Sequence, residues 1–251
     1  MSLKVKINVV HNFIPAGFSA VKSTAVAVLL LAAQSAHAGL IETVEAAGIQ
    51  TTTASNSTTI DFNKLSTGYS NSLAVNVTST LTATYSGNFS INAAGQYGGA
   101  VDPSTGKDTN YFAVTSGDVT LALSSAQAYF GLWISAADKF NQIAFYNGST
   151  EIAALTGTGS FLSALPSTYN GNPTADFKGQ DSGEKFVFVN FYAQTAQDEF
   201  DKIVLTNTPG SGTIFESDNH TFSTTLQAPI SGGTNLQGPS SVPEPSSFAL
   251  V

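Results

Sequence analysis

Acidic side chains gather next to predicted strand ends in the second half of the chain. Glu216 and Asp218 stand two residues apart and Asn219 follows them, while a similar oxygen-rich cluster occupies Asp198–Asp201. Calcium is a hard cation that takes carboxylate and carbonyl oxygens as ligands. We therefore expect a calcium site built from Glu216 and Asp218, with Asp61 as the partner from an early strand. The alternative is a solvated acidic rim that binds no ion.

Few residues are candidates for catalysis. Glu184, Glu199 and Glu216 could serve as the acid and base of a glycoside hydrolase on a β scaffold. A Ser-His-Asp site would need His220, the only histidine after residue 38, and no Gly-x-Ser-x-Gly motif accompanies it. The absence of cysteine and the scarcity of histidine disfavour a catalytic zinc site. We expect no enzymatic activity, and we expect His220 to be exposed or to cap a turn.

Aromatic side chains could instead bind a sugar ring by stacking. Trp133 is the only tryptophan, but it lies in the apolar run Tyr129–Ile134, which is more typical of a sandwich core. We expect Trp133 to be buried. Tyr97, Tyr146 and Tyr169 lie near predicted loops and are the expected exposed platforms.

The composition excludes nucleic-acid binding as a function. The chain has 251 residues and a formal net charge of −8, and it contains no arginine. Phosphate backbones are bound mainly through Lys and Arg, so neither nucleic acid nor an anionic membrane surface is an expected partner. Few charges combined with many Thr, Ser, Asn and Gly residues are typical of extracellular β-proteins.

Short alternating runs bounded by turn residues predict an all-β domain over residues 39–228, an antiparallel β-sandwich of jelly-roll type. Ser86-Gly87-Asn88 predicts a hairpin turn, and so does Asn147-Gly148. The block Asn110–Leu155 predicts five short strands in a meander or a jelly-roll sheet, and Phe186–Tyr192 predicts a buried strand. Further strands are expected at residues 41–45, 58–62, 75–77, 81–85, 89–91, 200–205, 213–215 and 221–225.

The N-terminal 38 residues have the pattern of a secretory signal peptide. Three lysines precede the apolar stretch or flank it, and the stretch itself, Ala25–Ala33, is shorter than the roughly 20 residues of a spanning helix. Ala36 and Ala38 form the small-x-small pattern that signal peptidase accepts, which predicts cleavage before Gly39. The alternative is an uncleaved membrane anchor.

The C-terminal end carries a Pro-Glu-Pro triplet. A Gly/Ser/Pro-rich segment at residues 229–241 reads as a flexible linker before it, and the short apolar run Phe248–Val251 follows it. Together these features resemble a partial C-terminal sorting signal (PEP-CTERM) of bacterial exosortase-dependent surface proteins. The residues that match this motif are Val242, Pro243, Glu244, Pro245 and Ser246.

The internal segment Asn110–Leu155, with Phe200–Leu205 and Phe215–Asn219, also looks like the body of one group of these surface proteins. The family pattern continues after Pro-Glu-Pro with a spanning helix and a basic cluster, whereas four residues cannot cross a bilayer. The resemblance therefore implies either an incomplete signal or release of the protein.

The resemblance implies a non-enzymatic protein that is exported and then displayed on the surface, or placed in the extracellular matrix, of a Gram-negative-type bacterium. Signal peptidase and an exosortase would be its partners during export, and extracellular polysaccharide would be its partner afterwards. The alternatives are a calcium-dependent carbohydrate-binding module and, as a third function, a glycan-processing enzyme.

Overall fold

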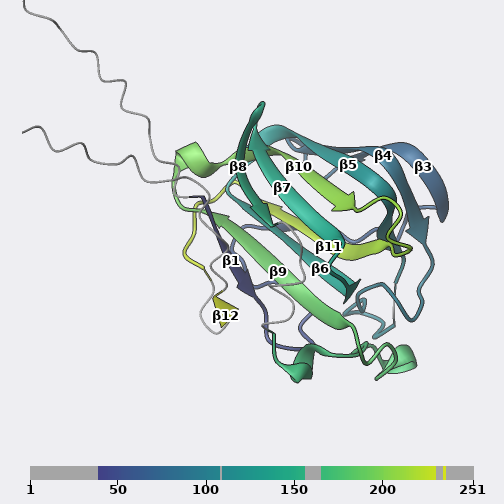
Figure 1. Cartoon of the computed structure of the whole chain (residues 1–251). Helices are drawn as coiled ribbons and strands as arrows, with labels where there is room; N and C mark the ends of the chain where they lie inside the picture. Colours follow the sequence, from purple (N-terminus) through teal and green to yellow (C-terminus); the bar gives the residue numbers. More distant parts are fainter. Residues whose placement is uncertain (1–38, 108, 156–164, 230–233, 236–251) are drawn as a thin grey trace, which may run out of the picture. The chain divides into compact units, whose positions relative to one another are not determined.

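The computed structural model describes residues 39–107, 109–155, 165–229 and 234–235, and these described residues all belong to one compact unit. These residues form an antiparallel all-β domain without α-helix, as the sequence predicts (Figure 1). The strands are β1 (Leu40–Val44), β2 (Thr58–Ile60), β3 (Gly68–Asn76), β4 (Thr82–Asn92), β5 (Tyr111–Gln127), β6 (Tyr129–Ala137), β7 (Asn141–Asn147), β8 (Thr150–Leu155), β9 (Lys185–Ala193), β10 (Phe200–Asn207), β11 (Phe215–Ser223) and β12 (Thr234–Asn235). Three short 3₁₀ turns, η1 (Ser167–Tyr169), η2 (Ala175–Phe177) and η3 (Ala196–Asp198), lie before and after β9.

Strand β5 is the point at which the sheet divides into two arms. One arm continues from β5 through β11, β6, β9 and β1 to β12, and the other through β10 and β7 to β8. Strands β3 and β4 extend the sheet on the other side of β5. After β5 the chain alternates between the arms, which gives the sandwich-like, nearly closed arrangement seen in Figure 1. The predicted antiparallel sandwich of jelly-roll type is confirmed.

The interior between the arms is filled by the inward faces of the strands. In β9 the alternation of Val187, Val189 and Phe191 with polar or aromatic neighbours places these three side chains in the main core. Phe130, Leu132 and Ile134 of β6 face the same interior from the neighbouring strand. Burial of this apolar surface is the main favourable term in folding.

The three central strands β6, β9 and β11 are buried on both faces. Every residue of β6 and β11 is buried, and so is every residue of β9 except Lys185. Loops cover the outer face of these strands, as Ala100 does where it packs against Trp133 and Phe188. Gln50 connects these loops, because its side chain accepts a hydrogen bond from Val101 N (2.7 Å) and donates one to Thr174 Oγ1 (3.3 Å). The covering segments therefore form a third layer over one arm of the sandwich.

His220 lies in the interior, so the expectation of an exposed or turn-capping histidine is wrong. It is 0% exposed, and its two ring nitrogens lie 2.9 Å from Tyr85 Oη and 3.0 Å from Ser217 Oγ. Burial lowers the pKa of His220 to about 3, so the ring is neutral. A bulge in β11 at Asn219, which has φ 51°, turns His220 and Ser217 toward the same face.

Several predicted turns are absent from the structure. β4 runs unbroken through Ser86-Gly87-Asn88, so the predicted hairpin there is wrong. β5 likewise joins two of the predicted short strands, and β6 pairs with β9 and β11 instead of β5 and β7, which excludes a meander. The hairpin predicted at Asn147-Gly148 forms between β7 and β8, but its turn residues are Gly148 and Ser149, because Asn147 ends β7 and pairs with Thr150. β12 falls inside the predicted linker, where Thr234 and Asn235 pair with the free edge of β1.

We predict that His220→Ala lowers the free energy of unfolding by about 3 kcal/mol or more. The substitution opens a cavity and leaves the buried hydroxyls of Tyr85 and Ser217 without their partner. Urea denaturation measures this change. The control is Tyr69→Ala, which removes a side chain that is 85% exposed and should change stability by only about 0.5 kcal/mol. Equal losses in the two variants would contradict the prediction.

Candidate functional site

The three predicted calcium ligands do not form one cluster in the structure. Asp61 is exposed and accepts a hydrogen bond from Asn63 N at 3.3 Å. Glu216 and Asp218 lie on the outer face of β11, and both are buried. Among the residues that the structure describes, no group of three or more His, Asp or Glu side chains is placed to hold a metal ion.

Asp218 already has hydrogen-bond partners in the protein. Its carboxylate accepts from Ala100 N (2.8 Å), Asn219 N (2.7 Å) and Thr109 Oγ1 (3.0 Å). Burial nevertheless raises its pKa to about 7, and the negative charge of Asp61 adds to the rise. Asp218 thus fixes the loop that carries Ala100 to the sheet.

Glu216 is the most strongly perturbed carboxyl. It is 8% exposed, and burial raises its pKa to about 9, with further contributions from the charges of Asp138, Glu184 and Asp181. Two of the three proposed hydrolase glutamates, Glu184 and Glu216, therefore interact electrostatically. Glu199 lies in a different place, between η3 and β10, where its backbone carbonyl accepts a hydrogen bond from Asn147 Nδ2.

The other acidic cluster shapes turns. Asp198 accepts hydrogen bonds from the backbone and hydroxyl of Thr195 in a capping box at η3. Asp201 Oδ1 accepts from Gly148 N at 2.9 Å and so fixes the β7–β8 hairpin. The Asp198–Asp201 cluster thus stabilises local backbone.

The predicted aromatic platforms have mixed outcomes. Trp133 is buried as predicted, but it lies under the covering loops beside Phe186 and Phe188 instead of in the sandwich interior. Tyr97 is exposed as predicted, at 48%. Tyr169 is 7% exposed, so its prediction is wrong; its hydroxyl donates to the carbonyl of Glu45 in the covering layer.

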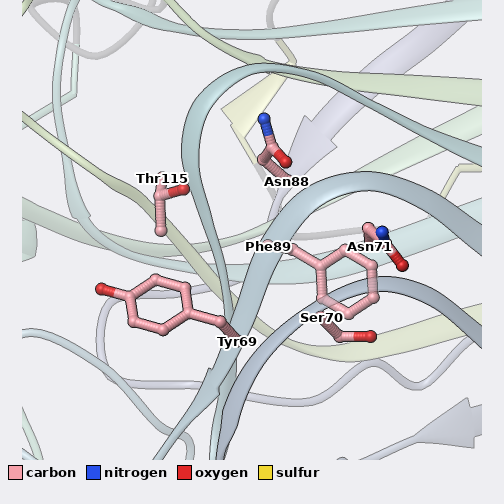
Figure 2. A pocket seen from close by; sticks show the side chains of 6 residues that line it. All are labelled: Tyr69, Ser70, Asn71, Asn88, Phe89 and Thr115. Carbon is pink, nitrogen blue, oxygen red and sulfur yellow. The ribbon is translucent and has the colours of Figure 1, made fainter.

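The exposed aromatic that sequence reasoning missed is Tyr69, at 85% exposure. It stands at the rim of an open groove of about 540 Å³ on the outside of β3, β4 and β5 (Figure 2). None of the lining residues carries a charge. They are Tyr69, Ser70, Asn71, Asn88, Phe89 and Thr115.

The groove forms where three neighbouring strands are irregular. The ladder between β3 and β4 shifts at Ser70/Ser72, and the ladder between β4 and β5 shifts at Gly87/Phe89. Opposite the second shift, β5 carries extra residues between Val114 and Val119. Bulges of this kind redirect side chains and are frequent next to binding sites. Here the residues inside the shifts supply three polar groups of the groove, Asn71, Asn88 and Thr115.

Gly87 is required for this arrangement. A Cβ atom at Gly87 would meet the backbone of Asp118 and lie 3.0 Å from the Cα of Val119, and its φ of 132° is unfavourable for other residues. Asn207, at the end of β10, holds the bulge from the opposite side by donating to the carbonyl of Thr115 at 3.2 Å. The groove therefore rests on a fixed backbone.

The groove combines one exposed ring with amide and hydroxyl groups. An aromatic face stacks on apolar faces of a ligand, and amides and hydroxyls can donate and accept hydrogen bonds. Because no lining residue is charged, the groove suits an uncharged, hydroxyl-rich ligand. Nothing in its side chains could act as general acid, general base or nucleophile at neutral pH without activation.

No family model matches the chain, and the searches of curated proteins and of solved structures return no match. Within the described part of the chain, no helix has the length and apolar character to span a membrane. The predicted signal peptide with its cleavage pair Ala36 and Ala38 lies outside the described residues, and so does the motif Val242–Ser246.

The buried carboxyls predict a stability maximum on the acid side of neutrality. Glu216, with a pKa of about 9, and Asp218 and Glu42, with pKa values of about 7, retain protons in the folded state at pH values where the unfolded chain has released them. Stability therefore falls as the pH rises from about 4.5 to 9. His220 acts in the opposite sense and lowers stability below about pH 6.5, because only the unfolded chain binds its proton there.

We expect the largest free energy of unfolding at about pH 4 to 5, measured by urea denaturation across the pH range. Glu216→Gln should flatten the curve between about pH 7 and 9, where Glu216 is the carboxyl that still titrates. A maximum above pH 8, or an unchanged slope in the variant, would contradict the assignment.

Proposed function

We propose that the chain is a non-enzymatic exported protein of the cell surface or extracellular matrix that binds an uncharged polysaccharide in the Tyr69 groove. The observation that carries the glycan part is the combination of an 85%-exposed tyrosine with Asn71, Asn88 and Thr115 around one groove without a charged side chain. Export and sorting by an exosortase rest on the N-terminal pattern and on the Pro-Glu-Pro resemblance of residues 242–246.

The groove supports glycan binding for three physical reasons. It is open, so that a polymer can lie along it without threading its end. Its backbone is fixed by the bulges, so that little conformational entropy is lost on binding. Its hydrogen-bonding groups are amides and hydroxyls, which match the hydroxyls of a neutral sugar.

The groove distinguishes this function from the calcium-dependent alternative. A sugar bound through a calcium ion needs carboxylate ligands beside it, and none of the lining residues is acidic. Binding in the Tyr69 groove should therefore not require calcium.

The test is binding of neutral bacterial exopolysaccharide and its oligosaccharides by isothermal titration calorimetry. We expect Tyr69→Ala to weaken binding about tenfold through loss of stacking. Adding Asn88→Ala to this variant should weaken binding further through loss of a hydrogen bond. The matched control is Tyr97→Ala, which removes another exposed tyrosine outside the groove and should leave the affinity unchanged. Loss of binding in Tyr97→Ala but not in Tyr69→Ala would reject the groove, as would binding abolished by EDTA.

A further inference from the structure

The ends of β6, β9 and β11 bring several acidic residues to one edge of the covered outer face. Ser135 of β6 is in register with Glu216 of β11, and Ala137 of β6 is in register with Lys185 of β9. Asp138 follows Ala137 and Glu184 precedes Lys185, so the next antiparallel pair beyond the ladder consists of these two acids. The topology thus places Asp138, Glu184 and Glu216 at one end of three adjacent strands.

A turn adds a fourth carboxylate to this end. Glu184 N donates to Asp181 O at 2.8 Å, which ties Asp181 to Glu184. Burial raises the pKa values of Glu184 and Glu216, and the negative charges of Asp138 and Asp181 raise both of them further. Lys185, next in sequence, directs its Nζ to the carbonyls of Leu165 (3.0 Å) and Pro166 (3.1 Å).

Buried polar atoms without partners point to a ligand at this place. Ser135 is 0% exposed, and its Oγ has no hydrogen-bond partner among the described residues. It stands opposite Glu216, which is more than nine-tenths buried, on the same face of the sheet. Asp181 Oδ2 is also buried and lacks a partner within the described part of the chain. Such orphaned groups cost free energy unless something binds them.

We propose that Glu216, Ser135, Glu184, Asp138 and Asp181 form a calcium site at this edge. Oxygen donors alone are present, and carboxylates with a hydroxyl are a ligand set that a hard cation accepts. A bound cation would displace the proton that Glu216 otherwise retains at neutral pH, would offset the repulsion among the acids and would coordinate the orphaned oxygens of Ser135 and Asp181. This site shares Glu216 with the sequence prediction but replaces Asp61 and Asp218.

Binding requires side-chain rotation, because the acids as they lie are not grouped closely enough to hold an ion. Glu216 and Ser135 are held by the ladder, whereas Asp138, Asp181 and Glu184 lie outside it and are only half-buried, and Asp138 would have to give up the hydrogen bond that its Oδ1 accepts from Phe140 N at 2.6 Å. Rotation of the second set toward the first reduces the affinity, so we expect a Kd of about 10⁻⁴ to 10⁻³ M, as in other extracellular modules. Calcium should be preferred over magnesium, which demands a stricter octahedral geometry.

The experiment measures the melting temperature and the calorimetric Kd of the full chain with CaCl₂ and, separately, with MgCl₂. We expect a rise in melting temperature with calcium and a smaller rise with magnesium at about 1 mM of either ion. Glu184→Gln, which changes a half-buried side chain, should weaken the calcium Kd about tenfold. Ser135→Ala removes the orphaned hydroxyl and should also weaken it, without loss of the fold.

The matched control is Asp61→Asn, which changes an exposed acid of the sequence-predicted site only. Calcium binding should be unaffected in this variant. The proposal is overturned if calcium neither raises the melting temperature nor gives a heat of binding. It is also overturned if Asp61→Asn abolishes binding while Glu184→Gln retains it.

Discussion

The architecture depends on the pairing of β5. Along one side β5 pairs with β4, whereas along the other side its first part pairs with β11 and its later part pairs with β10. A continuous strand can meet both requirements only if it bends, and the residues between Val114 and Val119 provide the bend. Asn207 stabilises the bend because its buried amide donates to the carbonyls of Thr115 (3.2 Å) and Thr213 (2.6 Å). These two bonds connect β10, β5 and the segment before β11 at the point where the arms separate.

Because the arms separate, the sheet has outer faces that point away from the interior. One of these faces is covered by loops and another is open, and this difference decides where the buried carboxyls and the Tyr69 groove lie. On the β6–β9–β11 arm, loops cover the face and bury Asp218 and Glu216, which raises their pKa values. On the β3–β4–β5 side, the bulges leave the face open, and Tyr69 remains exposed beside amide groups. The covered face thus carries the perturbed carboxyls, while the open face carries the groove.

Sequence patterns predict the elements that depend on local residues. Phe186–Tyr192 predicts a buried strand because nearly all of its residues are apolar, and β9 is buried on both faces. Asn147-Gly148 predicts a hairpin, and this hairpin forms with Gly148 and Ser149 in the turn, where Gly148 takes the positive φ. Ser86-Gly87-Asn88 has the same kind of residues, yet it forms a bulge, because β5 pairs with β4 on both sides of it. That outcome depends on a distant partner strand, which no local pattern reveals.

The same dependence on distant parts of the chain explains why the sequence does not predict the surroundings of the site residues. The burial of His220 depends on a one-residue shift in β11 against β6, and the failure of Asp61 to join Glu216 depends on which loops cover which strand. Tyr69 was missed because its neighbours Gly68 and Ser70 read as a polar turn, with no apolar alternation to indicate a strand. The signal available in the sequence is a lone aromatic residue within a run of Ser, Thr, Asn and Gly.

The most direct test of the account is amide chemical-shift mapping by NMR while the protein is titrated with a neutral exopolysaccharide oligosaccharide. If the aligned bulges form the binding groove, the largest shifts should fall on Tyr69, Asn71, Asn88 and Thr115. Shifts concentrated instead around Tyr97 or Glu216, or no shifts at saturating oligosaccharide, would contradict the central claim.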